Sequence, residues 1–202
     1  MSMTLHSSAL SPFGRKVKLA LHHLGLMSGV TVVTTDTMNA EDPIRRTNPL
    51  GKIPALVLAD GTVVYDSRVI LEQLDLLAGG GKIVPAEPKA RIAALTLQAL
   101  ADGIMDALIL TRYEVMFHDE AARSEKWFAH QRGKVERAMA ALEAAPPALA
   151  VHVGTITLAC ALGYQDIRFE GTWRKSYPKL VAWLDAFIAG MPAAWAETTP
   201  KT

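Results

Sequence analysis

The sequence is poor in cysteine: Cys160 is the only one among 202 residues. A single cysteine excludes an intramolecular disulfide, a Cys-x-x-Cys redox pair and a cysteine-based zinc site. Because Cys160 lies in the apolar run 158–162, we expect a buried and unreactive thiol. The 6 histidines form no His-Glu-x-x-His pattern, so no metal site is expected.

Charge of one sign and long apolar runs are also scarce. The formal net charge is +1 and no long run of Lys and Arg occurs, which gives little support to a nucleic-acid or membrane-surface partner. Residues 1–6 lack the basic and apolar segments of a targeting signal, and no run of about 18 apolar residues occurs. We therefore expect a soluble, cytoplasmic protein that binds neither nucleic acid nor membrane.

The hydrophobic pattern divides the chain into two parts. Strand-like and helix-like segments alternate from residue 3 to about residue 78, and only helical periods follow. Strands are predicted at 3–7, 29–34, 55–58 and 62–65, with Asp60-Gly61 as the hairpin turn between the last two. A strand-helix-strand start implies parallel pairing, and the hairpin adds antiparallel strands. We expect a mixed four-stranded sheet with helices on its faces.

A glycine- and proline-rich segment at 79–87 is predicted to link two domains, 1–78 and 88–202. In the second domain, helices are predicted at 89–118, 121–145, 153–168 and 177–189. The third of these has almost no polar face, so it is the expected buried centre of an all-helical domain.

Three short segments in the first part carry the chemistry. They are Ser11-Pro12-Phe13-Gly14-Arg15-Lys16, Asn48-Pro49-Leu50-Gly51-Lys52-Ile53-Pro54 and Tyr65-Asp66-Ser67-Arg68. The first places a hydroxyl at a helix start, the second offers an extended backbone edge before a proline, and the third places an acid and a hydroxyl at another helix start. Together they are suited to bind a small thiol peptide.

With Asp102-Gly103-Ile104-Met105-Asp106-Ala107, Arg112-Tyr113-Glu114 and the segment 161–169, these residues resemble the glutathione transferase family over nearly the whole chain. The resemblance implies an α/β thioredoxin-like N-terminal domain joined to an all-α C-terminal domain, and a homodimer. It also implies an enzyme that uses glutathione as co-substrate, stabilises its thiolate and transfers it to a small, hydrophobic electrophile.

The resemblance assigns thiol activation to Ser11. Lowering a thiol pKa from ~8.5 to ~6.5 requires ~2.7 kcal/mol. A hydroxyl hydrogen bond to a charged acceptor supplies ~1.5–3 kcal/mol, and a helix N-terminus adds ~0.3–1 kcal/mol. Ser11 is also suited to be a plain helix cap, and both roles are compatible. Relatives with a serine catalyst often carry it one residue earlier, where Leu10 stands, so Ser8 and Ser7 remain rivals.

Six further positions are assigned to glutathione by the same resemblance: Phe13, Lys52, Ile53, Pro54, Asp66 and Ser67. Ile53 would pair through its backbone with the cysteinyl part of glutathione, before a cis proline. Lys52 would meet the glycyl carboxylate. Asp66 would meet the ammonium group, and Ser67 the γ-glutamyl carboxylate at the positive end of a helix.

The second substrate is expected between the domains, against the first long helix. The residues proposed for this wall are Met105, Leu108, Ile109, Arg112 and Tyr113, which lie one or two turns apart. A Met and Leu stripe at helical spacing is more often plain core.

One departure from the family concerns the helix at 153–168. Relatives open it with Ser or Thr followed three residues later by Asp, a reciprocal capping box. His152 and Thr155 stand at these positions, so we expect the box to be missing, at a cost of ~0.5–2 kcal/mol in stability.

Two other functions remain open on the same fold. A non-catalytic glutathione-binding or regulatory protein would keep the groove without an activating hydroxyl. A glutathione-dependent reductase or peroxidase normally carries cysteine where Ser11 stands, which disfavours it. The residues do not specify the electrophile, or whether the reaction is conjugation, isomerisation or dehalogenation.

Overall fold

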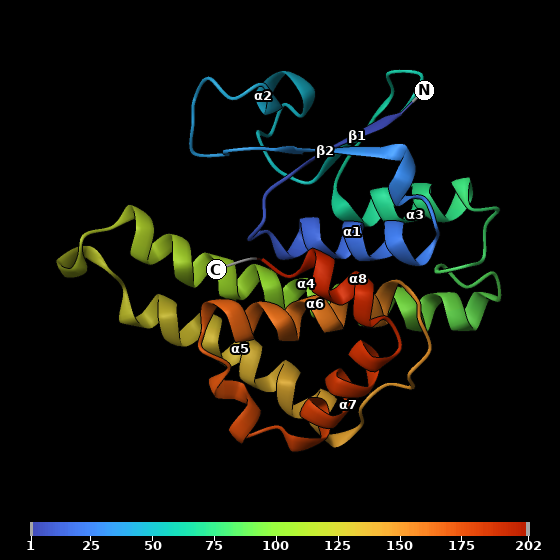
Figure 1. Cartoon of the computed structure of the whole chain (residues 1–202). Helices are drawn as coiled ribbons and strands as arrows, with labels where there is room; N and C mark the ends of the chain where they lie inside the picture. Colours follow the sequence, from blue (N-terminus) through green and yellow to red (C-terminus); the bar gives the residue numbers. More distant parts are fainter. Residues whose placement is uncertain (1, 201–202) are drawn as a thin grey trace.

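The computed structural model describes residues 2–200 and is shown in Figure 1. Met1, Lys201 and Thr202, at the ends of the two expected domains, lie outside the described residues. The first part of the chain forms a four-stranded sheet in the order β2-β1-β3-β4. Its strands are β1 (Met3–Ser7), β2 (Val30–Thr34), β3 (Ala55–Val57) and β4 (Val63–Val64). β1 pairs parallel with β2 and antiparallel with β3, and β3 pairs antiparallel with β4, which confirms the predicted mixed sheet.

Helices cover both faces of this sheet. α1 (Pro12–His23) and α3 (Ser67–Leu77) lie between the sheet and the helical part of the chain, and the short α2 (Ile44–Thr47) lies on the far side (Figure 1). A 3₁₀ turn, η1 (Met27–Gly29), leads into β2. Leu5 and Leu56 on the strands are fully buried in the same core as Val17 and Ile70 on the helices. Burial of these apolar faces fixes α1 and α3 on the sheet.

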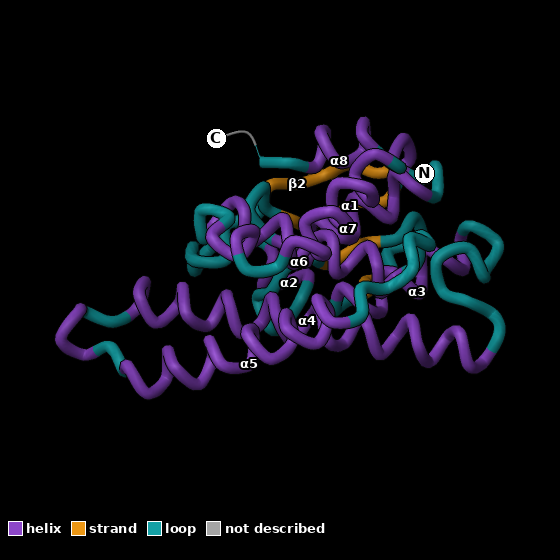
Figure 2. The backbone as a smooth tube through the Cα atoms, turned by 90° about the horizontal axis from the view of Figure 1, so that it is seen from below, coloured by secondary structure: helices purple, strands orange, loops and turns teal. Residues whose placement is uncertain are grey.

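The rest of the chain is helical, as predicted. The elements are α4 (Pro88–Phe117), η2 (Glu120–Ala122), α5 (Glu125–Ala144), α6 (Val153–Arg168), η3 (Thr172–Lys175), α7 (Pro178–Ala189) and α8 (Pro192–Thr198). Figure 2 shows α4 and α5 side by side, extending beyond the other elements. Every residue from 153 to 165 is buried, which confirms α6 as the centre of the helical part. The sequence patterns did not predict α8.

The start of α6 corrects one expectation. His152 caps the helix through Nδ1, which accepts the N–H groups of Gly154 at 3.1 Å and Thr155 at 3.4 Å. The Thr155 Oγ1 atom accepts the His152 N–H at 3.0 Å, so the reciprocal capping box is present. The expectation of a missing box at His152 and Thr155 was wrong, because a neutral imidazole supplies the acceptor that Ser or Thr normally supplies.

The segment between the two parts is held firmly. The Asp75 carboxylate accepts the backbone N–H groups of residues 81–84 at 2.7 to 3.2 Å. Ile83 and Val84 are buried in a hydrophobic core that also contains residues of the sheet and of α6. α1 packs directly on α6 and α8. The two parts therefore share one core across a fixed connection.

Among residues 2–200, α4 alone is long and apolar enough to cross a membrane by length and composition. In its most apolar window, 44% of the residues are buried inside the protein, and the helix packs along α5 and α6. The core helix of a soluble protein passes the same test, so this feature is weak support for a membrane role.

Cys160 lies in the middle of α6 and is fully buried. Burial raises the pKa of its thiol to about 12, so the thiolate is negligible near neutral pH. The expectation of a buried thiol is confirmed. Within residues 2–200 no group of three or more His, Cys, Asp or Glu side chains is placed to hold a metal ion.

Candidate functional site

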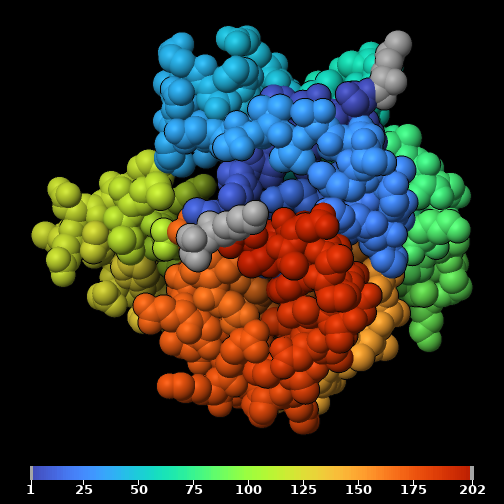
Figure 3. Space-filling view, viewed as in Figure 1, coloured from blue at the N-terminus to red at the C-terminus, as the bar shows by residue number. Residues whose placement is uncertain are grey.

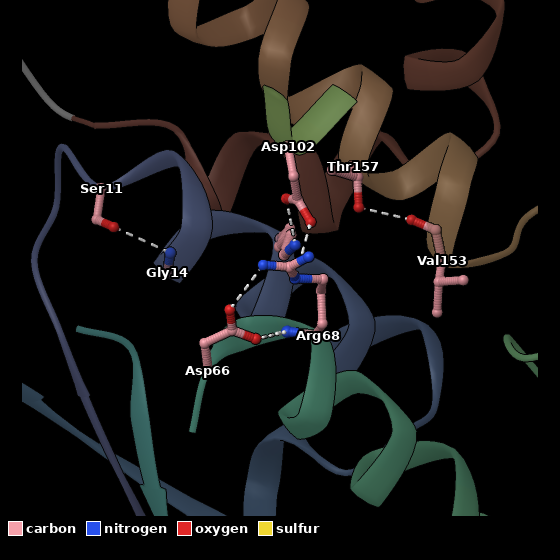
Figure 4. A network of polar contacts seen from close by, with 8 residues as sticks. Ser11, Gly14, Asp66, Arg68, Asp102, Val153 and Thr157 are labelled. Atoms are coloured by element: carbon pink, nitrogen blue, oxygen red, sulfur yellow. Dashed lines mark hydrogen bonds and ion pairs between the residues drawn. The ribbon is translucent and has the colours of Figure 1, made fainter. Parts of the chain in front are cut away.

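Ser11 stands where β1 has ended and α1 begins. Pro12 opens the helix, and the Ser11 Oγ atom caps it by accepting the Gly14 N–H at 3.1 Å (Figure 4). A serine hydroxyl has one hydrogen to donate besides its lone pairs, and this cap uses only a lone pair. Ser11 therefore caps the helix and keeps a donor for another acceptor at the positive end of α1.

The two rival serines lie in different surroundings. Ser7 is only 1% exposed, its hydroxyl donates to the Ser8 carbonyl at 3.4 Å, and it packs so tightly on Gly14 that a side chain there would clash with it. Ser8 lines the same cleft as Ser11. Ser7 therefore faces the packing between β1 and α1, whereas Ser8 and Ser11 face the cleft.

Asn48 shapes the loop that leads to Pro54. Its buried side chain donates from Nδ2 to the Lys52 carbonyl at 2.9 Å and accepts the Leu50 N–H at 3.1 Å. Gly51 has a φ of 61°, a left-handed conformation that favours glycine. The Ile53–Pro54 peptide bond is cis, as the family resemblance implies.

The third segment opens α3. Asp66 caps this helix by accepting the Arg68 N–H at 3.0 Å, and the Arg68 guanidinium lies 3.1 Å from its other carboxylate oxygen. Burial alone would raise the pKa of Asp66, but the Arg68 N–H and guanidinium outweigh it and lower the pKa below the usual value. Ser67 is buried directly behind this cap.

Arg68 connects Asp66 to Asp102 on α4. Figure 4 shows the guanidinium between the two acids, with Nε 3.7 Å from Asp102 Oδ2. Asp102 Oδ1 lies 2.5 Å from Lys16 Nζ. Burial raises the pKa of Asp102 and lowers that of Lys16, and their contact opposes both shifts. Asp102 Oδ2 has no hydrogen-bond partner among the described residues.

These residues surround a small groove of about 120 Å³. Its lining includes all six residues expected to bind glutathione, Phe13, Lys52, Ile53, Pro54, Asp66 and Ser67. Asn48, Arg68, Asp102 and Asp106 also line it. The folded chain thus brings together the second and third sequence segments, with α4 as the opposite wall.

The groove is continuous with a larger cleft of about 660 Å³, because four residues line both: Phe13, Lys52, Ile53 and Asp106. The cleft lies between the loop after β2 and the C-terminal half of α4, where Figure 3 shows a hollow. Ser8 and Ser11 lie in its wall. A ligand that fills the groove therefore extends naturally toward both serines.

The structure brings three of the five expected second-substrate residues to this cleft. Ile109, Arg112 and Tyr113 line it. Met105 is fully buried in the core, and Leu108 lines another cavity, so neither contributes to the cleft. For these two, the alternative reading as core residues describes their positions better.

Several residues of the site were not assigned from the sequence. Tyr164 and Arg168 reach the cleft from α6, and Thr37 and Met38 reach it from the loop after β2. The spacing of four residues between Tyr164 and Arg168 places them on one helical face, as does the spacing between Asp102 and Asp106. That spacing is the signal available in the sequence, but it does not specify the facing helix.

A separate cavity of about 730 Å³ lies within the helical part, between α4, α5, α6 and η3. Leu108, Phe128 and Trp173 are among its lining residues, and it shares Arg112 and Met116 with the cleft. It contains none of the six groove residues. Although it is the larger space, the residues expected to bind glutathione line the groove, and Ser8 and Ser11 line the cleft.

Comparison with known proteins agrees with this geometry. Residues 10–77 match the family model for the glutathione S-transferase N-terminal domain. The uncharacterized GST-like protein YibF of Escherichia coli K12 is 34% identical, with 98% of each chain covered. A glutathione transferase family member from Pseudomonas fluorescens Pf-5, solved with bound glutathione, is 41% identical with a TM-score of 0.91, and the match covers 100% of both chains.

A second structure of a Pf-5 family member contains S-(propanoic acid)-glutathione. It is 42% identical, with a TM-score of 0.88, and the match covers 99% of this chain and 100% of that one. The sheet order and the helical part agree with the thioredoxin-like fold of these transferases. From the family model, the full-length relative and these structures together, the chain belongs to the glutathione S-transferase family.

Proposed function

We propose that this protein is a glutathione transferase that binds glutathione in the groove, stabilises its thiolate and transfers it to a small electrophile in the cleft. The observation that carries the proposal is the continuity of the two spaces. The groove lined by all six expected residues opens into the cleft where Ser11 keeps a free hydroxyl hydrogen at a helix N-terminus.

The groove has a group to match each end of glutathione, with Lys52 for the glycyl carboxylate. The ammonium group fits beside Asp66, which lines the groove together with Asp102, whose buried Oδ2 lacks a hydrogen-bond partner among residues 2–200. The γ-glutamyl carboxylate fits Ser67 at the N-terminus of α3. The cysteinyl backbone fits the extended Ile53 before its cis proline. This orientation directs the thiol past Phe13 toward the cleft.

In the proposed reaction, the Ser11 hydroxyl donates a hydrogen bond to the sulfur and the N-terminus of α1 adds its positive potential. Both favour the thiolate, so the thiol proton leaves to solvent near neutral pH. The sulfur then attacks the electrophilic carbon, a sulfur–carbon bond forms, and the bond from that carbon to its leaving group breaks as the group departs with its electron pair. The glutathione thioether bound to the similar Pf-5 protein is a compound of the kind that such a transfer produces.

The alternatives differ in what they need from Ser11. A non-catalytic or regulatory protein would bind glutathione without changing the thiol pKa. A disulfide reductase or peroxidase would need a redox-active thiol, and Cys160 is fully buried in α6, away from the groove. The free hydroxyl of Ser11 in the cleft favours transfer, with detoxification in the cytoplasm as the proposed setting.

Titration of the thiolate absorbance of bound glutathione tests this proposal. We expect a pKa well below ~8.5 with the wild-type protein, a higher pKa with Ser11→Ala, and little change in glutathione affinity by calorimetry. Ser8→Ala is the matched control. A rise in the pKa with Ser8→Ala alone would assign activation to Ser8. An unshifted thiol on the wild-type protein would favour a non-catalytic role.

We also propose a homodimer. Several apolar side chains on α3 and α4 are exposed, including Val69 and Leu76 on α3 and Ile92 and Leu100 on α4. Apolar groups gathered on neighbouring helices favour association with a second copy. Sedimentation of the wild type beside the Leu76→Glu and Ile92→Glu variants tests the proposal, and a wild-type monomer would reject it.

A further inference from the structure

The cleft carries two guanidinium groups from different helices. Arg112 projects from α4 and Arg168 from the end of α6, and both line the cleft. Neither forms an ion pair with an acidic residue in the described part of the chain. The Nε atom of Arg168 is buried and has no hydrogen-bond partner among residues 2–200. Two cations therefore line one space, and neither is paired with an acid among the described residues.

Several other arginines of the chain have partners. Arg15 is buried, but it donates to Thr199 Oγ1 at 2.6 Å and stacks on the Trp195 ring at 3.8 Å. Arg68 contacts Asp66, and Arg174 contacts Asp166 at 2.7 Å. A partly desolvated guanidinium without such a partner favours an anion in its neighbourhood. The two arginines of the cleft wall therefore favour binding of a negatively charged group.

The remaining polar groups of the cleft do not neutralise this pair. Asp106 is the one acid in the described lining, and it lies at the end shared with the groove, as Lys52 does. Tyr164 lies beside both arginines. Burial raises the pKa of its hydroxyl, and the two guanidinium groups oppose the rise. Tyr164 therefore stays neutral near pH 7, while Leu10, Ile109 and Met116 supply apolar wall.

Resting on the proposed transferase function, we propose that the electrophile carries a carboxylate, which Arg112 and Arg168 bind while its carbon skeleton lies on the apolar wall. The substrates in this class are small carboxylic acids with a leaving group on an electrophilic carbon. The glutathione sulfur attacks that carbon, the sulfur–carbon bond forms, and the leaving group departs with its electron pair. The thiol proton goes to solvent, so no oxidant or further reactant is needed.

Matched pairs of electrophiles test the charge alone. Iodoacetate and iodoacetamide form a short pair, and 4-fluoro-3-nitrobenzoate and 4-fluoro-3-nitrobenzamide form a long pair that places the carboxylate farther from the reacting carbon. After division by the uncatalysed rate, we expect kcat/KM of the wild type to favour the acid of at least one pair by about tenfold or more.

Variants of the two arginines test whether Arg112 and Arg168 cause the preference for the acid. Arg112→Gln and Arg168→Gln should each lose most of the preference for the acid, with little change toward the amide. Arg168→Lys should keep part of it, because lysine retains the charge but not the planar fork. Arg137→Gln is the control, since Arg137 is exposed on α5 and lines neither the groove nor the cleft. It should behave as the wild type does.

Binding separates this inference from the transferase proposal. By calorimetry, S-(carboxymethyl)glutathione should bind the wild type about tenfold tighter than S-(carbamoylmethyl)glutathione. The difference should vanish in Arg112→Gln and Arg168→Gln. Equal binding of the two thioethers by the wild type, or a preference that survives in both variants, would overturn the carboxylate site even if neutral probes are conjugated. Preferred binding of the acid thioether without conjugation of any probe would instead reject the transferase function and leave the anion site.

Discussion

Lys16 on α1 and Asp102 on α4 form an ion pair of 2.5 Å that joins the sheet-containing part of the chain to the helical part. Lys16 is 0% exposed and Asp102 is 4% exposed. Asp102 also lines the glutathione groove. An acid that lines the groove beside Asp66 is therefore held by a buried cation at the junction of the two parts.

Substitution of Asp102 and substitution of Lys16 should lower the free energy of unfolding by different amounts. Asp102→Leu leaves the Lys16 ammonium group buried without its partner, so we expect a loss of about 3–5 kcal/mol in the free energy of unfolding. Lys16→Met should cost less, because Arg68 remains 3.7 Å from Asp102 and the carboxyl is able to take up a proton. Urea unfolding measures both.

The double variant Lys16→Met/Asp102→Leu is the control for this prediction. Replacing both charges with apolar side chains removes the buried charge, so most of the stability should return. A double variant that loses the sum of the two single effects would contradict the prediction.

The cap on α6 should make stability depend on the protonation of His152. Its Nδ1 accepts two backbone N–H groups, which requires the neutral ring, and burial lowers the pKa of His152. The cap is then fully effective above the unfolded-state pKa of about 6.5 and is lost as the pH falls through the lower folded-state pKa. We expect ~0.5–2 kcal/mol of stability to disappear over that window.

His152→Asn isolates this contribution, because asparagine caps helices without titrating in this range. Unfolding free energies of both proteins between about pH 8 and about pH 5 should diverge only at the acidic end, with the wild type falling faster. Parallel curves would show that the imidazole cap does not control acid stability. His152→Ser with Thr155→Asp should bring no large gain, since the box is already formed.

Because of the contact between Ser7 and Gly14, alanine should be less stabilising than glycine at position 14, which is the reverse of the usual order in helices. Alanine stabilises a helix interior by about 1 kcal/mol relative to glycine. A side chain at position 14, however, would meet the buried Ser7 hydroxyl. We expect Gly14→Ala to destabilise the protein by about 1–3 kcal/mol. Thermal unfolding of Gly14→Ala, Ser7→Ala and the double variant measures this, and the double variant should recover most of the loss. A more stable Gly14→Ala would mean that Ser7 simply rotates away.

Asp66→Asn should separate the cap of α3 from the binding of glutathione. Asparagine still caps a helix, so the melting temperature should change little, while the charge that meets the ammonium group is lost. We expect the KM for glutathione to rise about tenfold or more with a smaller change in kcat, and Ser67→Ala to act in the same direction. Asp60→Asn, in the β3–β4 turn, is the surface control. Wild-type affinity in both site variants would remove the proposed carboxylate and ammonium contacts.

The sequence predicted those parts of the fold that follow from local periodicity. The bounds of α6 agree with the prediction, because its uninterrupted apolar character indicates a buried helix. The helix α8 was missed, since seven residues are too short to show a period. The cap at His152 was missed for a chemical reason: an imidazole caps only when neutral and correctly turned, which residue identity does not specify.

The residues of the candidate site divide in the same way. Local sequence patterns indicate some of them, and only the packing of distant helices brings in the others. Ser11, Ile53 and Asp66 each lie in a contiguous segment whose local pattern indicates a helix start or an extended edge. Asp102 and Arg168 reach the site from helices far along the chain, and their side-chain directions depend on how those helices pack on α1. A list of helical positions spaced by three and four therefore included Met105 and Leu108, which point elsewhere.

The anchoring of Arg15 by Trp195 and Thr199 sets an order of events during synthesis. Arg15 emerges from the ribosome 184 residues ahead of Thr199, its hydrogen-bond partner. At about 5–20 residues per second, this separation amounts to roughly 10–40 s. Until then α1 lacks both α8 and the groups that satisfy a buried guanidinium. The helix that Ser11 caps therefore reaches its final environment only after residue 199 has been synthesised.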